Sequence, residues 1–192
     1  MGSALSKSLS KGNYRLLLKA SKYDASEALA KEIKSTNPSA DVEAMSCPKD
    51  AGWETDIIIV AVPFSAEKEV AESIREVANQ KIVISLANPV NETYNGLVPS
   101  SESSAAEELQ KLLPHSKVIK AFNTVFATDF STPVIDGKQV DTFIVGNDDE
   151  ALQTVSELVS TAGLNPIIAG DLSVSRTLEK YAAAAYSTGY EV

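Results

Sequence analysis

The feature that most constrains the fold is an alternation of two kinds of segment along the chain. Short and almost wholly apolar runs, rich in Ile, Val and Leu, are separated by longer amphipathic runs. Short runs of this kind are typical of strands buried on both faces, as in parallel sheets. The short runs are Tyr14–Leu18, Asp56–Val62, Lys81–Ala87, Lys117–Phe122, Thr142–Gly146 and Asn165–Gly170, and Asp41–Ser46 is a further short candidate.

The longer runs carry apolar residues at helical spacing, so each predicts a helix. One opens with Ser104 and Glu107 at the spacing of a capping box. Strands alternating with helices predict an α/β fold, with a doubly wound, mostly parallel sheet and helices on both faces. The length of 192 residues fits a single domain over residues 1–192. The expected helices are Ser3–Ser10, Asp24–Lys34, Ser65–Asn79, Ser104–Leu113, Asp148–Ala162 and Leu172–Tyr186.

The start of the chain departs from this alternation, because a helix comes first and no strand precedes it. In a Rossmann-type dinucleotide-binding fold the first strand ends in Gly-x-Gly-x-x-Gly, whose last glycine lies inside the first helix. Gly2, after Met1, fits that last glycine. We therefore expect a Rossmann-type fold that lacks its usual first strand. Met-Gly-Ser is also a common cloning leader, so the motif alone leaves both interpretations open.

The end of the Tyr14–Leu18 run indicates which dinucleotide is bound. Lys19, Ser21 and Lys22 follow it, and no acidic residue occurs before Asp24. Basic and hydroxyl side chains at this place accept the extra phosphate of NADP, whereas an acid accepts the ribose hydroxyls of NAD. The residues favour NADP(H), with a solvated basic turn as the alternative.

Two other strand ends carry residues suited to a cofactor. Pro63 follows the Asp56–Val62 run and stops the hydrogen-bond ladder of that strand, because proline has no N–H. Small side chains beside it let a ring or ribose approach the backbone. Asn88 and Asn123 follow two further runs. A carboxamide both donates and accepts hydrogen bonds, which suits a ribose or a nicotinamide amide, although asparagine is also a common turn residue.

Composition excludes several classes of partner. The net charge of −9 disfavours nucleic acid and anionic lipid. No apolar run approaches the roughly 20 residues of a membrane span, and the start is too polar for a signal peptide, so we expect a cytoplasmic protein. Cys47 and His115 are the only cysteine and histidine, which rules out an internal disulfide and a His/Cys zinc site.

Taken together, the segments resemble the NADP-dependent oxidoreductases that reduce the deazaflavin coenzyme F420, and they are similar to the NADPH-binding domain of the STEAP metalloreductases. The resemblance covers nearly the whole chain. It rests most on the stretches 59–63, 86–89, 118–125 and 143–148, and on Gly170-Asp171-Leu172 followed by Arg176-Thr177-Leu178-Glu179.

The resemblance implies hydride transfer between NADP(H) and a flavin-like or deazaflavin acceptor. It implies no catalytic acid or base and no metal, because such enzymes hold two rings close and let the cofactors react. It also makes a homodimer plausible. The implied cofactor-binding residues are Met1, Gly2, Ser21, Lys22, Ala61, Val62, Pro63, Phe64, Asn88, Pro89, Ala121 and Asn123.

Two other interpretations stay open at this point. One is a dinucleotide-binding sensor module without turnover. The other is an inactive fragment, because members of the family begin with a strand and two further glycines and continue beyond Val192. We expect a native product to begin roughly ten residues upstream, the length of one short strand and its glycine turn.

Overall fold

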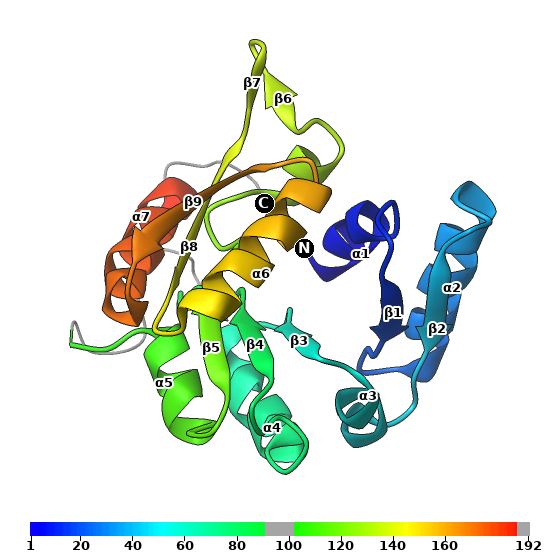
Figure 1. The fold of residues 1–192 in the computed structure, drawn as a ribbon, viewed down its shortest axis with the longest axis horizontal. Coiled ribbons are helices and arrows are strands. Elements are labelled where there is room, and N and C mark those ends of the chain that lie inside the picture. The colour runs from blue at the N-terminus through cyan, green and yellow to red at the C-terminus, as the bar shows by residue number, and fades with distance from the viewer. Residues whose placement is uncertain (91–101, 188–192) are drawn as a thin grey trace.

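The computed structural model describes residues 1–90 and 102–187. Figure 1 shows them as an α/β fold. The helices are α1 (Gly2–Leu9), α2 (Tyr23–Thr36), α3 (Pro48–Glu54), α4 (Phe64–Ile74), α5 (Ala105–Leu112), α6 (Asp149–Thr161) and α7 (Ser175–Ser187), with 3-10 helices η1 (Ala127–Phe130) and η2 (Leu172–Val174). The strands are β1 (Arg15–Leu18), β2 (Asp41–Ala44), β3 (Ile57–Val60), β4 (Ile82–Ser85), β5 (Lys117–Lys120), β6 (Val134–Ile135), β7 (Lys138–Gln139), β8 (Asp141–Gly146) and β9 (Asn165–Gly170).

The largest sheet has five strands in the order β3-β4-β5-β8-β9. β3, β4 and β5 pair in parallel without a register shift, so Val60, Ser85 and Lys120 stand side by side. β8 runs antiparallel to β5 and parallel to β9. A mostly parallel sheet with a strand in each apolar run confirms the predicted fold class.

Helices cover both faces of this sheet, which explains its apolar strands. Alternate residues of a strand point to opposite faces. Val83 and Val118 pack with side chains of α4 and α5, whereas Ile84 and Ile119 pack with side chains of α1 and α6. All four strand residues are at most 2% exposed. Burial of both faces is what the unbroken apolar runs predict.

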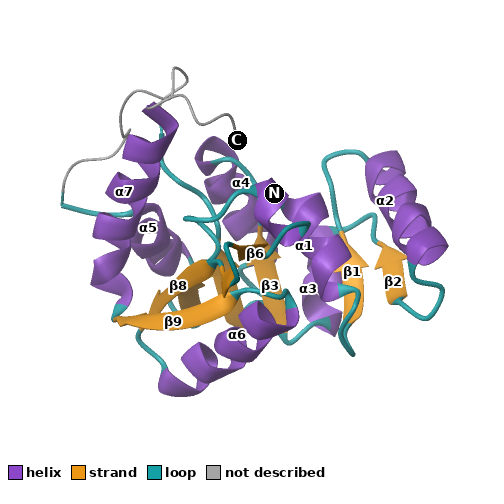
Figure 2. Cartoon of the chain, turned by 90° about the horizontal axis from the view of Figure 1, so that it is seen from above, coloured by secondary structure: helices purple, strands orange, loops and turns teal. Residues whose placement is uncertain are grey.

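β1 and β2 form a separate two-stranded parallel sheet. Together with α2 they stand to one side of the larger sheet (Figure 2). Their own small core contains Ala30, Ile33 and Val42. No pairing joins β1 to β3 in the described residues, so β1 and β2 stay separate from the five-stranded sheet, whereas a doubly wound fold joins such strands in one sheet.

Some elements were not anticipated from the sequence. α3 and the β6–β7 hairpin fall in stretches where no regular structure was expected. The predicted helix Leu172–Tyr186 is two elements, η2 and α7. The stretch 88–103, which is rich in Asn, Ser, Pro and Gly and predicts a loop, lies mostly outside the described residues.

Candidate functional site

The carboxyl ends of β3, β4 and β5 form one edge of the sheet, because the three strands are parallel and in register. The structure brings three groups of predicted site residues to this edge, which we call the rim. Ala61, Val62, Pro63 and Phe64 lead from β3 into α4. Asn88 and Pro89 follow β4, and Ala121 and Asn123 follow β5.

Asn88 and Asn123 are joined by two hydrogen bonds across the rim. The Asn88 amide donates to the Asn123 carbonyl at 2.8 Å, and the Asn123 amide donates to Oδ1 of Asn88 at 3.0 Å. Asn123 is only 3% exposed. Its own Oδ1 and the neighbouring Oγ1 of Thr124 are buried without a partner among the described residues. Buried polar atoms without partners are rare, so the rim offers two groups that a ligand can satisfy.

The backbone just before Asn123 is strained. Phe122 has φ of 62°, in the left-handed region that bulky residues avoid. Such a conformation costs on the order of 1–3 kcal/mol and persists where packing enforces it. The Phe122 ring is fully buried and its centroid lies 6.0 Å from that of Phe130. Packing of this ring therefore fixes the turn that presents Asn123.

Gly2 lies at the same rim, close to the end of β3. A Cβ built on Gly2 would lie 3.2 Å from Cβ of Ala61, tighter than ordinary contact. The first amides of any helix lack partners within the helix, and α1 has no side-chain cap. The start of α1 therefore places free amides and no side-chain bulk at Gly2, beside Ala61.

Ser21 and Lys22 lie elsewhere than the other predicted site residues. They follow β1 and precede α2, on the other side of the break between the two sheets. Both residues are exposed. The structure thus divides the predicted site into the rim, with Gly2, and a basic turn on the smaller sheet.

Behind the rim lies a buried charged cluster that the sequence analysis did not anticipate. Lys120, at 0% exposure, places Nζ 2.7 Å from Oε1 of Glu179 and donates to the carbonyl of Ala87. Ser85 donates to Oε1 of Glu67 at 2.9 Å. Burial raises the pKa of Glu67 to about 7, while Lys120 opposes the rise and Glu179 adds to it. The cluster joins β4, β5, α4 and α7, and its contact with Ala87 lies next to Asn88 in the chain.

Helix α7 is tied to the start of α5 by polar contacts. Glu179 accepts hydrogen bonds from the backbone N–H groups of Ala105 and Ala106, at 2.9 and 3.4 Å. Arg176 makes a bidentate pair with Glu107 at 2.7 and 2.6 Å, which lowers the pKa of that carboxyl. Arg176 and Glu179 of α7 therefore each have a partner on α5.

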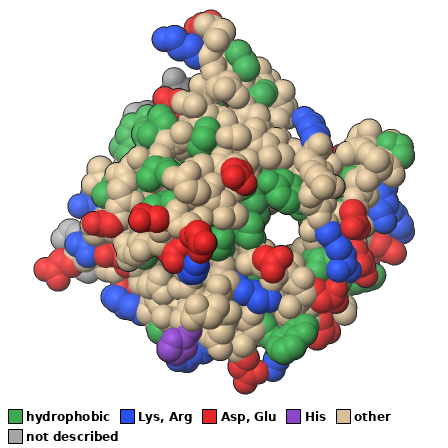
Figure 3. Space-filling view, in the orientation of Figure 1, with side chains coloured by type: hydrophobic (Ala, Val, Ile, Leu, Met, Phe, Trp, Pro, Cys, Tyr) green, Lys and Arg blue, Asp and Glu red, His purple; other side chains and the backbone are tan. Residues whose placement is uncertain are grey.

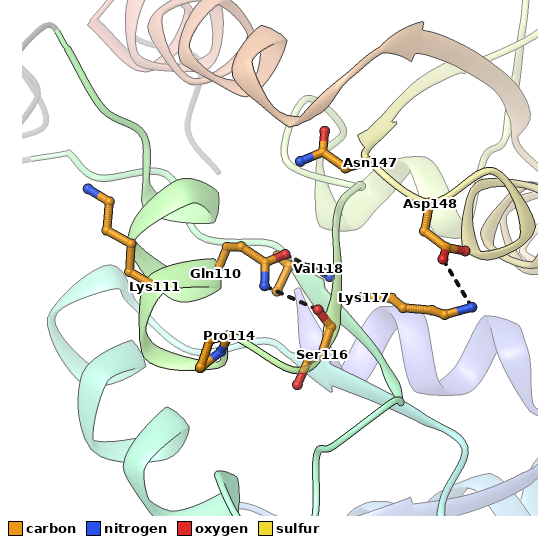
Figure 4. Close-up of a pocket in the computed structure, with 8 residues that line it drawn as sticks. All are labelled: Gln110, Lys111, Pro114, Ser116, Lys117, Val118, Asn147 and Asp148. Carbon is orange, nitrogen blue, oxygen red and sulfur yellow. Dashed lines mark hydrogen bonds and ion pairs between the residues drawn. The ribbon is translucent and has the colours of Figure 1, made fainter.

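A surface pocket of about 440 Å³ lies at the opposite edge of the sheet. Figure 4 shows its lining, including Lys117 at the start of β5 and Asp148 just after β8. Lys117 pairs with Asp148 at 3.1 Å. Because β8 runs antiparallel to β5, this pocket adjoins the amino end of β5 and contains no predicted site residue.

Two further features, a metal site and a membrane-spanning helix, are absent from the described ranges. Residues 1–90 and 102–187 hold no group of three His, Cys, Asp or Glu side chains placed to bind a metal. Within the same ranges, no helix is both long enough and apolar enough to span a membrane.

The fold and the rim define a Rossmann-type dinucleotide-binding protein, with polar groups at the carboxyl ends of parallel strands. Residues 1–89 match the family described as NADP oxidoreductase, coenzyme F420-dependent. The chain is 32% identical over 189 residues to the F420-dependent NADP reductase of Methanocaldococcus jannaschii, covering 93% of this chain and 82% of that one. The chain belongs to the family of coenzyme F420-dependent NADP oxidoreductases, which confirms the resemblance.

More distant similarities are consistent with this assignment. Rat metalloreductase STEAP3 is 31% identical over 140 residues, which are 71% of this chain and 25% of that protein. A solved structure of a putative F420-dependent NADP reductase from Arthrobacter superposes with a TM-score of 0.81 at 21% identity, covering 97% of this chain and 87% of that one. The similarity to the Arthrobacter structure shows that the two chains share a fold.

Proposed function

We propose that this chain binds NADP(H) along the rim and exchanges a hydride between it and a deazaflavin of the F420 type. The observation that carries the proposal is the asparagine pair of the rim, with one buried amide oxygen left without a partner among the described residues. Membership of an NADP-dependent oxidoreductase family supplies the reaction class.

The residues at the rim fit the nicotinamide end of the dinucleotide. The carboxamide of nicotinamide has two N–H donors and one acceptor oxygen. Oδ1 of Asn123 can accept a hydrogen bond from these donors, and the hydroxyl of Thr124 can accept or donate one. Ala87 and Ala121, at the ends of β4 and β5, bring no bulk to the edge. Asn123 would then orient the amide, with Asn88 and Pro89 beside the ribose.

Gly2 and the basic turn would hold the phosphates. Free amides at a helix start favour a pyrophosphate, and the absence of a side chain on Gly2 lets it come close. Ser21 and Lys22 would bind the additional phosphate that distinguishes NADP from NAD. Lys gives one point charge there and cannot form the bidentate contact of Arg.

When bound, the nicotinamide ring supplies the hydride chemistry, and the chain supplies position. We assign no acid or base to the described rim, because the hydride would pass directly between the two rings and the proton that the reduced deazaflavin also takes up would come from solvent. Ala61 to Phe64 would form the wall against which the dinucleotide lies. A flavin in place of the deazaflavin is the alternative acceptor.

We further propose that the protein acts in the cytoplasm as a homodimer. The dimer is supported by apolar residues on the projecting β6–β7 hairpin, where Val134 and Ile135 are 48% and 56% exposed. Sedimentation of the purified chain tests the dimer, and a monomer at micromolar concentration would refute it.

The proposed activity is tested by two measurements on the purified chain. Fluorescence titration should show that NADPH binds more tightly than NADH. NADPH oxidation should then depend on added oxidised F420, with FMN and FAD as comparison acceptors. Tight NADPH binding without oxidation by any acceptor would instead favour a sensor module, and no binding of either dinucleotide would contradict the proposal.

A further inference from the structure

A lysine stands at the end of β5, inside a strand whose other side chains form an apolar core. On the face of the molecule that Figure 3 shows, charged side chains are spread over the surface, where water solvates them. Lys120, in contrast, is 0% exposed. It lies on the same face of the sheet as Val118, which packs with side chains of α4 and α5. Because a buried charge is costly unless it is paired and hydrogen-bonded, the contacts of Lys120 indicate its role.

The Lys120 ammonium has three N–H donors, and the structure gives it three partners. Nζ lies 2.7 Å from Oε1 of Glu179, donates to the carbonyl of Ala87, and lies 3.5 Å from Oγ of Ser85. With these contacts and no exposed surface, the ammonium has no donor left for a ligand. Lys120 can therefore act on a cofactor only through the groups that it holds.

The contact with Ala87 supports backbone that the sheet does not hold. The register of β4 with its two neighbours ends at Ser85, and the amide of Leu86 makes one further bond. Ala87 lies beyond this ladder, and Asn88 follows it. The ammonium of Lys120 gives the Ala87 carbonyl a charge-assisted hydrogen bond, which is roughly twice as strong as a neutral one. It therefore fixes the backbone from which the Asn88 side chain projects.

The position of Asn88 determines that of its partner on the rim. Asn88 donates to the carbonyl of Asn123 at 2.8 Å and accepts from the amide of Asn123 at 3.0 Å. Lys120 belongs to β5, the strand that leads to Asn123, so it supports one asparagine through the strand and the other through Ala87. This arrangement also places Oδ1 of Asn123, which is buried without a partner among the described residues.

Glu179 holds the lysine at a fixed point. It is 2% exposed and accepts hydrogen bonds from the backbone N–H groups of Ala105 and Ala106 at the start of α5. Arg176 and Glu107 join the same two helices nearer the surface. Apolar residues of similar volume often fill a buried site as stably as an ion pair does, so packing alone does not require the buried charges. What the buried pair adds to this junction is its hold on the carbonyl that follows β4.

We propose that Lys120 is a positioning residue, whose ammonium, anchored by Glu179, fixes Asn88 and Asn123 in the geometry that receives the nicotinamide amide. This inference rests on the proposed function, in which Asn123 orients that amide. Lys120 itself has no contact with the cofactor and no part in proton transfer. Loss of the ammonium should weaken binding of the nicotinamide end alone, because the basic turn that would bind the adenosine end lies on the smaller sheet.

The test compares two variants of the whole chain. Lys120→Met alone leaves Glu179 buried without its cation, so the test variant is Lys120→Met, Glu179→Gln, in which glutamine keeps an acceptor for the α5 amides. The control, Arg176→Met, removes the neighbouring ion pair between α7 and α5. Both are assayed at a temperature at which circular dichroism shows them folded. Titrations measure the binding of NADPH and of 2′-phospho-ADP-ribose, which is NADP without its nicotinamide.

The double variant should bind NADPH about tenfold more weakly than the parent and 2′-phospho-ADP-ribose equally well. Arg176→Met should bind both ligands as the parent does, since a merely structural loss does not separate the two ends of the cofactor. Equal weakening of both ligands in the double variant, an unchanged NADPH affinity, or the same separation in Arg176→Met would overturn the proposal.

A readout without cofactor separates this inference from the proposed function. The side-chain amides of Asn88 and Asn123 each donate within the rim, so their nuclear magnetic resonance signals should be protected from solvent exchange in the parent. The double variant should lose this protection, and Arg176→Met should keep it. If the parent bound neither ligand, the proposed function would fail. Lost protection in the double variant would still support the positioning role, and unchanged protection would refute it.

Discussion

Nζ of Lys120 lies 2.7 Å from Oε1 of Glu179, and the two side chains are 0% and 2% exposed. The pair links the end of β5 to α7, and Glu179 also accepts from the first amides of α5. Lys120 in addition donates to the carbonyl of Ala87, next to Asn88 of the rim. Because burying a charge is costly without a partner, each member of the pair depends on the other.

Removal of one partner from this pair should be strongly destabilising. Lys120→Met leaves Glu179 buried without its cation, and we expect a loss of about 3–5 kcal/mol in the free energy of unfolding. Urea denaturation measures this loss. The double variant Lys120→Met, Glu179→Leu should lose less free energy of unfolding than the two single variants lose in total.

A matched exposed pair provides the control. Lys31 and Glu27 lie 3.1 Å apart on α2 with side chains 73% and 47% exposed. Lys31→Met should cost less than about 1 kcal/mol, because solvent screens the pair. Equal losses for Lys120→Met and Lys31→Met would contradict a structural role for the buried cluster.

Glu67 should make stability depend on pH. Folding raises its pKa from 4.5 to about 7, chiefly by burial, so the folded state holds the proton more tightly than the unfolded state. The stabilising contribution is therefore complete below about pH 4.5 and is lost as pH rises through about 7. The shift corresponds to roughly 3 kcal/mol.

Glu67→Gln isolates this contribution. Glutamine keeps the shape and an acceptor for Ser85 but does not titrate. Between pH 5 and pH 8 the parent protein should lose more of its free energy of unfolding than the variant loses, as measured by urea denaturation at each pH. Parallel pH profiles for the two proteins would show that Glu67 does not titrate in this range.

The sheet could be predicted from the sequence because strands buried on both faces must be apolar throughout. Val83, Ile84, Val118 and Ile119 illustrate the rule. The direction of β8 could not be predicted, since an apolar run is the same in a parallel and an antiparallel strand. α3 was missed because it has only seven residues, among them Pro48 and Gly52.

The rim was anticipated because polar residues after parallel strands share an edge, and the structure places Asn88 and Asn123 together there. The charged cluster was not anticipated. Lys120 stands inside an apolar run, and such a lysine has to be paired or neutral. That signal was available, but its partners Glu67 and Glu179 come from helices distant in sequence, and only the tertiary fold brings them together.

Asn123 should control dinucleotide affinity. Asn123→Ala removes the amide oxygen that has no partner among the described residues and the bond to Asn88. We expect NADPH to bind about tenfold more weakly, equivalent to about 1.4 kcal/mol. Fluorescence titration measures the change. Asn165→Ala is the control, because Asn165 bonds Asp141 at an exposed site; equal weakening in both variants would refute a specific role.

Gly2 and Ala61 should act as a pair. In Gly2→Ala the added methyl would lie 3.2 Å from Cβ of Ala61, so α1 must shift by a few tenths of an ångström. We expect weaker NADPH binding with little loss of stability, since alanine is the better helix former by about 1 kcal/mol. Adding Ala61→Gly removes the opposing methyl and should restore affinity. Failure of the double variant to recover NADPH binding would show that the contact with Ala61 does not set the phosphate site.

Lys22 should select NADP over NAD. It is exposed immediately before α2, in the turn after β1 where the additional phosphate of NADP is proposed to bind. Lys22→Ala should weaken NADPH binding about tenfold and leave NADH binding unchanged, because only NADPH carries that phosphate. The loss should shrink at high salt, since an exposed charge pair is screened. Lys34→Ala, at the other end of α2, is the control for a general charge effect. If both variants weaken NADPH and NADH alike, the selectivity lies elsewhere.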